Sequence, residues 1–179
     1  MNVAVAEFAP QSSAAHPHEP ICRADALRAQ RAWSEMVIEI GEVVRAGGDH
    51  RSHAETLLRK VYDFDRGPVL LKPAFAGGQP IRTEFEDIAS YYVGGGVWED
   101  EGFALKPWRK IRFGRQYASF GQGSATLMGS CFLRPVRSAI ETQIDFTMGF
   151  RRDPQGVARM TLHHSSAPFR PIRGAELAA

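Results

Sequence analysis

The chain has 179 residues, of which 44% are hydrophobic and 23% are charged, values typical of one soluble globular domain. Its 22 basic and 20 acidic residues leave a formal net charge of +2, so the composition gives no support for binding nucleic acid or an anionic membrane. No apolar stretch approaches the roughly 20 residues that cross a bilayer. The N-terminus MNVAVAEFAP lacks the basic and apolar regions of a secretory signal, so we expect a cytoplasmic protein.

The first 22 residues are rich in Ala, Ser, Pro and His and show no hydrophobic periodicity, which predicts a disordered tail over 1–22. We expect a single domain over 23–172 and a short C-terminal tail over 173–179. The two cysteines, Cys22 and Cys131, are far apart and form neither a disulfide framework nor a metal-binding pattern.

Three helices are predicted in the first half. Apolar residues recur at helical spacing over 24–46 before Gly47-Gly48. A second helix is expected to open at Ser52, where Ser52 and Glu55 have the spacing of a capping box, and to continue to about Phe64. After a short strand over 69–72, a second capping box over 83–86 predicts a third helix that ends at 94–96, a run of three glycines.

The second half has the period of strands. Runs over 108–120, 124–134, 138–151 and 157–166 are joined by short links, and the last link, Asp153 to Gly156, has a turn composition. Consecutive strands of this kind form an antiparallel meander. The chain is therefore predicted to be α+β, with three helices packed on one face of a strongly curved antiparallel sheet and a cone-shaped interior between them.

The alternation within the strands predicts which residues face that interior. In the third long strand the apolar set is Ile140, Ile144, Phe146, Met148 and Phe150. In the last strand Met160 and Leu162 are apolar, and regular alternation carries their face onward to His164 and Ser166. His163 and Ser165 would then lie on the opposite face.

Polar groups at the end of an apolar interior are typical of a small-ligand pocket, and the alternative is that they bond to backbone or water at its rim. A Ser–His nucleophile is disfavoured, because residues two apart on a strand point in parallel and no Gly-x-Ser-x-Gly elbow is present. A divalent metal such as zinc could be bound by His50, His53 and Asp49, although a solvated helix start explains these three residues as well.

Four segments resemble the iota-class carbonic anhydrases. They are VLLKP (69–73), ASYYVGGG (89–96), EDEGFALKPW (99–108) and LHHSSAPF (162–169). These enzymes share a superfamily with the association domain of calcium/calmodulin-dependent kinase II and have a nuclear-transport-factor-like fold. The resemblance spans roughly residues 50–170, and its most specific part is the doubled His-Ser pair before a proline.

The resemblance implies a cone-shaped, usually dimeric protein that interconverts carbon dioxide and bicarbonate, in some members without a metal. Carried over by position, the site is the motif of His163, His164, Ser165 and Ser166 together with Tyr91, or Tyr92 as the alternative. Family members tend to have threonine directly after Lys-Pro, whereas this chain has Ala74; Thr83 or Lys72 could supply the missing polar group.

The resemblance leaves three functions open. The first is a metal-free carbonic anhydrase, and the second is a non-catalytic small-ligand-binding or oligomerisation module of the same fold. The third is an isomerase or dehydratase, which is disfavoured because the predicted interior supplies no carboxylate. We also expect a homodimer formed through the outer face of the sheet, where Trp108, Leu127 or Phe132 would remain apolar.

Overall fold

The computed structural model describes residues 20–169. Three helices, α1 (Arg23–Arg45), α2 (His50–Val61) and α3 (Phe85–Val93), precede four long strands. These strands are β2 (Trp108–Gly121), β3 (Ser124–Pro135), β4 (Thr142–Arg152) and β5 (Ala158–Ser166), and a short strand β1 (Leu70–Lys72) lies between α2 and α3. Two 3-10 turns, η1 (Phe64–Arg66) and η2 (Phe103–Leu105), complete the order. The α+β prediction is confirmed.

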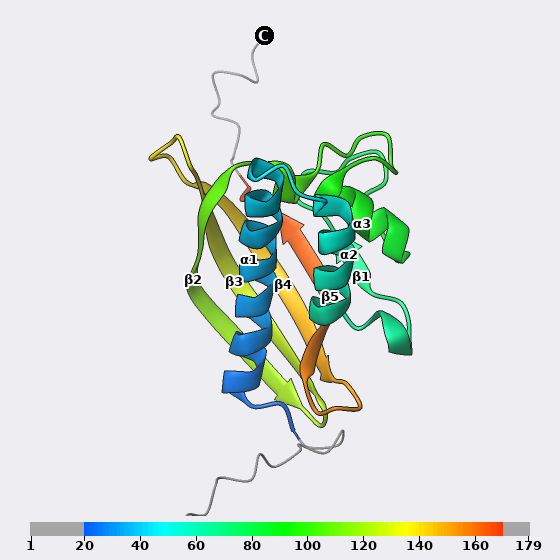
Figure 1. The fold of residues 1–179 in the computed structure, drawn as a ribbon. Helices are drawn as coiled ribbons and strands as arrows, with labels where there is room; N and C mark the ends of the chain where they lie inside the picture. The colour runs from blue at the N-terminus through cyan, green and yellow to red at the C-terminus, as the bar shows by residue number, and fades with distance from the viewer. Residues whose placement is uncertain (1–19, 170–179) are drawn as a thin grey trace, which may run out of the picture.

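The strands form one open sheet in the order β1-β5-β4-β3-β2, with α1 lying across one face and α2 and α3 beside it (Figure 1). The four long strands pair antiparallel, as predicted. The pairing of β1 is different, because β1 runs parallel to β5, with Leu71 opposite His163 and Lys72 opposite His164. This parallel pair brings the end of β1 alongside the end of the strand that carries the His-Ser motif.

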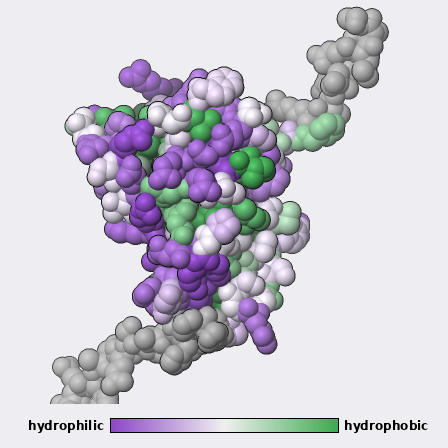
Figure 2. Space-filling view, turned by 90° about the vertical axis from the view of Figure 1, so that its right-hand side faces the viewer, coloured by the Kyte–Doolittle hydropathy of each residue, from purple (hydrophilic) through white to green (hydrophobic). Residues whose placement is uncertain are grey.

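The helices bury one apolar side against the sheet and leave a polar side in solvent. On α1 the buried positions include Trp33, Met36, Val37 and Ile40, which recur at the spacing of one helix face. On the side of the molecule that carries α2, α3 and β1, hydrophilic residues predominate, with hydrophobic ones interspersed (Figure 2). Within residues 20–169, no helix combines the length and hydrophobicity needed to cross a membrane.

The predicted helix starts were wrong in detail. The second helix begins at His50 because Asp49 caps it, its carboxylate accepting the backbone N–H of Ser52 at 3.1 Å. The helix therefore does not start at the predicted capping box of Ser52 and Glu55, because its N-cap lies three residues earlier, at Asp49. In the third helix the N-cap is Glu84, without a side-chain cap. The hydroxyl of Thr83 donates to the Glu84 carboxylate and does not accept a backbone N–H of the helix.

The strand β4 begins four residues later than predicted. Ile140 lies outside it and is 81% exposed, and its backbone N–H is bonded to the Ser138 hydroxyl in the connecting segment. The other four apolar residues of the predicted set are buried, as expected: Ile144, Phe146, Met148 and Phe150. The predicted tails over 1–22 and 173–179 lie mostly outside the described residues. Ile21, however, is 1% exposed, so the packed domain begins before residue 22.

Candidate active site

The inward His-Ser pair is His163 with Ser165, not the predicted pair of His164 with Ser166. His163 and Ser165 are 2% and 5% exposed, whereas His164 is exposed and Ser166 is half-buried. The two outward residues line a shallow hollow on the outer face of the sheet with Met128, Asp145 and Thr147. The prediction that His164 and Ser166 face the interior is wrong.

A β-bulge explains the reversal. In the β4–β5 ladder Phe150 lies opposite Met160, and Gly149 lies opposite Leu162, so Thr161 is an extra residue in β5. One extra residue shifts every later side chain to the other face of the strand. Gly149 allows the close approach at this point, since a Cβ there would lie 3.2 Å from the Cβ of Leu162.

His163 belongs to a buried hydrogen-bonded network that crosses the interior from α1 to β5. The Trp33 indole donates to the Tyr92 hydroxyl at 2.8 Å, and the hydroxyls of Tyr92 and Tyr62 lie 2.6 Å apart. The Tyr62 hydroxyl lies 2.8 Å from His163 Nδ1, and His163 Nε2 lies 3.1 Å from Ser165 Oγ. The bond between His163 and Ser165 corrects the expectation that their parallel directions would prevent it.

Burial keeps the members of this network uncharged. It lowers the pKa of His163 to about 3, with a smaller contribution from neighbouring His164. It raises the pKa of Tyr92 to about 12 and that of Tyr62 well above its ordinary value. His163 is therefore a neutral imidazole at physiological pH. Its second partner is a phenol instead of a carboxylate, so the arrangement lacks the third member of a catalytic triad.

Tyr91 lies beside the network at the wall of a cavity. The cavity has a volume of about 200 Å³, several times the roughly 30 Å³ that one water occupies in the liquid, and Tyr91, Phe75, Phe103 and Lys106 are among its lining residues. The Phe103 ring packs against the rings of Tyr91 and Tyr92, with ring centres 5.4 Å and 6.2 Å apart, respectively. Tyr91 thus lines a space large enough for a small ligand, while Tyr92, the alternative, supplies the hydrogen bonds to the network.

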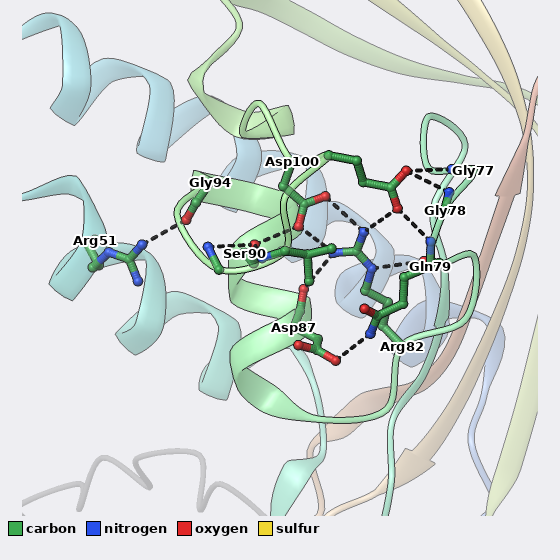
Figure 3. Close-up of polar contacts among 12 residues, drawn as sticks. Arg51, Gly77, Gly78, Gln79, Arg82, Asp87, Ser90, Gly94 and Asp100 are labelled. Carbon is green, nitrogen blue, oxygen red and sulfur yellow. Dashed lines mark hydrogen bonds and ion pairs between the residues drawn. The ribbon is translucent and has the colours of Figure 1, made fainter.

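A buried ion-pair cluster fixes the loops around this cavity (Figure 3). Arg82 is fully buried and donates to both carboxylate oxygens of Asp100 and, at 3.2 Å, to Glu99. The Ser90 hydroxyl donates to Asp100 at 2.6 Å. Glu99 in turn accepts the backbone N–H groups of Gln79, Gly78 and Gly77, which lower its pKa to about 2. Because Glu99 and Asp100 both line the cavity, this cluster holds one of its walls.

The candidate metal ligands of the sequence are not brought together. Asp49 caps α2, and His53 pairs with Glu39 at 2.7 Å. Over residues 20–169 there is no group of three or more His, Cys, Asp or Glu side chains that could hold a metal ion. The polar groups of the buried network are hydroxyls, an indole N–H and a neutral imidazole, which can act as hydrogen-bonding groups for a small oxyanion.

Sequence reasoning missed Trp33 and Tyr62. Trp33 has the helical spacing of a core residue, and Tyr62 is the C-cap of α2, outside any periodic pattern. Both are about 1% exposed although each carries a polar group, and a buried indole or phenol needs a hydrogen-bond partner. The sequence therefore indicates that a buried Trp or Tyr needs a hydrogen-bond partner, but it does not identify that partner.

An open sheet covered by helices, with a buried hydroxyl–imidazole network beside a small cavity, defines an NTF2-like α+β protein with a polar interior site. The same fold is found in an NTF2-like protein from Salmonella enterica, which is 12% identical with a TM-score of 0.53 and coverage of 84% of this chain and 94% of that one. The model of the metal-independent carbonic anhydrase family matches residues 24–167.

Two relatives are more similar in sequence. A metal-independent carbonic anhydrase from Nostoc sp. (strain PCC 7120) is 32% identical over 154 residues, which are 83% of this chain and 75% of the relative. The structure of a cyanobacterial iota-carbonic anhydrase complexed with bicarbonate superimposes with a TM-score of 0.77 at 30% identity, covering 90% of this chain and 99% of that one. The chain belongs to the metal-independent carbonic anhydrase family.

Proposed function

We propose that the chain catalyses the reversible hydration of carbon dioxide to bicarbonate without a metal ion. The observation that carries the proposal is the inward pair of His163 and Ser165, held by buried tyrosines inside a fold whose structural relative was solved with bicarbonate. Bicarbonate is small, flat and rich in acceptors. Hydroxyl donors such as Ser165 and Tyr91 can therefore position it, and in the hydration direction they position carbon dioxide and the attacking water.

His163 contributes as a neutral hydrogen-bonding group. A general base is most effective when its pKa lies near the working pH, and that of His163 is lowered to about 3. In hydration the water oxygen bonds to the carbon of carbon dioxide and releases one proton. Because His163 is a weak base, catalysis rests on orienting the reactants and on stabilising the negative charge that develops on the oxygens.

Stopped-flow measurement of carbon dioxide hydration tests the proposal, with and without a chelator. We expect activity that survives the chelator, a loss of about tenfold or more in Ser165→Ala, and near-normal rates in Ser166→Ala. The second variant is a matched control, because Ser166 adjoins Ser165 but does not share its buried position. An inactive wild type, or equal losses in the two variants, would contradict the proposal.

The non-catalytic binding module remains the second candidate because Ala74 replaces the threonine expected from the family resemblance. Bicarbonate binding detected by carbon-13 NMR in a protein without turnover would favour it. The isomerase has less support, since Glu99 and Asp100, the carboxylates that fix the cavity wall, are both paired with buried Arg82. The buried carboxylates Asp25, Asp63 and Asp153 are also each paired with an arginine.

We also propose that two copies associate through the outer face of the sheet. The prediction that Trp108 and Leu127 lie on this face is wrong, since both are buried in the core. Phe132 is half-buried, and the guanidinium of Arg112 lies 3.8 Å from the centre of its ring. Tyr117 and Met128 are among the exposed apolar residues of this face, and they lie opposite each other in β2 and β3.

Light scattering at micromolar concentration tests the association, with Met128→Lys as the variant expected to give monomers. A monomeric wild type would exclude it. The cytoplasmic location expected from the sequence stays a prediction, which cell fractionation would test.

A further inference from the structure

The donor and the acceptor of each hydrogen bond in the buried network can be assigned, because the network begins at the Trp33 indole, a group that can only donate. The Trp33 indole has one N–H and no acceptor, so the Tyr92 oxygen accepts at 2.8 Å. Tyr92 is fully buried, and among the described residues Tyr62 is the other polar neighbour of its hydroxyl, at 2.6 Å. The single hydrogen of Tyr92 must therefore be donated to Tyr62.

The same reasoning assigns the donor and the acceptor of each later hydrogen bond in the network, as far as Ser165. The Tyr62 oxygen is occupied by the Tyr92 hydrogen, so Tyr62 donates its own hydrogen to His163 Nδ1 at 2.8 Å. A neutral imidazole whose Nδ1 accepts carries its hydrogen on Nε2. Nε2 donates to Ser165 Oγ at 3.1 Å, and the Ser165 hydroxyl hydrogen is left for another acceptor.

We propose that Trp33 and Tyr62 are positioning residues that hold His163 as the Nε2–H tautomer and thereby direct the Ser165 hydroxyl hydrogen toward the bound oxyanion. The opposite direction would leave the Tyr92 hydrogen without a partner at a fully buried position, which is unfavourable. This role for the two residues rests on the proposed function, whereas the tautomer is a property of the protein alone.

The same geometry excludes a proton relay through the interior. A relay needs every member to accept one proton and pass on another, and the Trp33 indole cannot accept. The network is therefore closed at its α1 end. The proton that the attacking water loses must leave on the ligand side of Ser165 instead of through Tyr62 and Tyr92.

Long-range nitrogen-15 NMR of the histidine rings in the full chain tests the direction, with His163→Gln to assign the signal. The wild type should show His163 as the Nε2–H tautomer at neutral pH. Trp33→Phe removes the fixed donor, so we expect a mixture of tautomers and a fall in the hydration rate of roughly tenfold. Trp108→Phe is the matched control, because the Trp108 indole also donates a buried bond, to the Phe103 carbonyl at 2.8 Å, outside the network.

An Nδ1–H tautomer in the wild type, or an unchanged tautomer in a folded Trp33→Phe, would overturn the proposal. If Trp33→Phe does not fold, Tyr92→Phe removes the donor to Tyr62 and should give the same mixture. A wild type with the Nε2–H tautomer but without hydration activity would contradict the proposed function while supporting the direction of the network.

Discussion

Burial of a neutral histidine makes stability depend on pH in a way that one substitution can isolate. His163 takes up a proton near pH 6.5 in the unfolded chain but only near pH 3 in the folded protein. Between these values the unfolded state binds one more proton, so the free energy of unfolding falls as the pH falls. Above pH 6.5 neither state is protonated at this ring, and the effect vanishes.

The slope for one proton is about 1.4 kcal/mol per pH unit, so lowering the pH from 6 to 4.5 should remove about 2 kcal/mol through His163 alone. In His163→Gln this contribution is absent. The variant also loses the bonds to Tyr62 and Ser165, which should cost about 2 kcal/mol at pH 7.5. The gap between wild type and variant should therefore be large at pH 7.5 and nearly closed at pH 4.5.

Urea unfolding followed by circular dichroism at pH 7.5, 6.0 and 4.5 measures this gap. His164→Gln is the control, because His164 is the adjacent residue and is exposed. The control variant measures how much the loss of an exposed histidine at the adjacent position changes the free energy of unfolding. A gap that stays constant with pH for His163→Gln would refute the reasoning, since it would mean that His163 titrates alike in the folded and unfolded states.

Three further substitutions test the surroundings of the site. Asp100→Ala leaves the buried Arg82 guanidinium without its main partner and should lower the free energy of unfolding by about 3–5 kcal/mol in urea, whereas exposed Glu101→Ala should change it by less than about 0.5 kcal/mol. Gly149→Val should cost about 1–3 kcal/mol by crowding Leu162 at the bulge, as thermal unfolding would show. Ala74→Thr should raise the hydration rate about fivefold if its hydroxyl adds one hydrogen bond of about 1 kcal/mol to the ligand.

Each of these has a clear contrary result. Equal effects of Asp100→Ala and Glu101→Ala would show that the ion pair of Arg82 with Asp100 does not contribute to the free energy of unfolding. A neutral Gly149→Val would mean that the bulge does not need the close approach. Unchanged kinetics in a stable Ala74→Thr would place residue 74 out of reach of the ligand.

The elements of the fold could be predicted because their periods are regular. The alternation of Ile144, Phe146, Met148 and Phe150 fixed the inner face of β4. The prediction failed in β5, where Thr161 interrupts the alternation that connects Met160 to His163. Gly149 was the available signal, since a glycine inside a strand pattern often marks a bulge. It lies on the partner strand, however, and the sequence does not give the register that joins the two.

The site was harder to predict than the fold because its contacts are long-range. Tyr62 and His163 are 101 positions apart, and Trp33 and Tyr92 are 59 apart. The residue types suggest polar groups in need of partners, but only the packing of α1 and α2 on the sheet selects the pairs. The parallel pairing of β1 with β5 could not be predicted from the local sequence pattern either, because no short turn connects the two segments.

The bulge at Thr161 also makes the doubled motif redundant. If the bulge were lost and Thr161 took a regular place in the ladder, His163 and Ser165 would turn outward and His164 and Ser166 would face the interior in their place. The interior would receive the same two functional groups at the same spacing in either register. In evolutionary terms, the sequence HHSS protects the chemistry of this strand against a change of register by one residue, an event that would destroy a site built on one histidine and one serine.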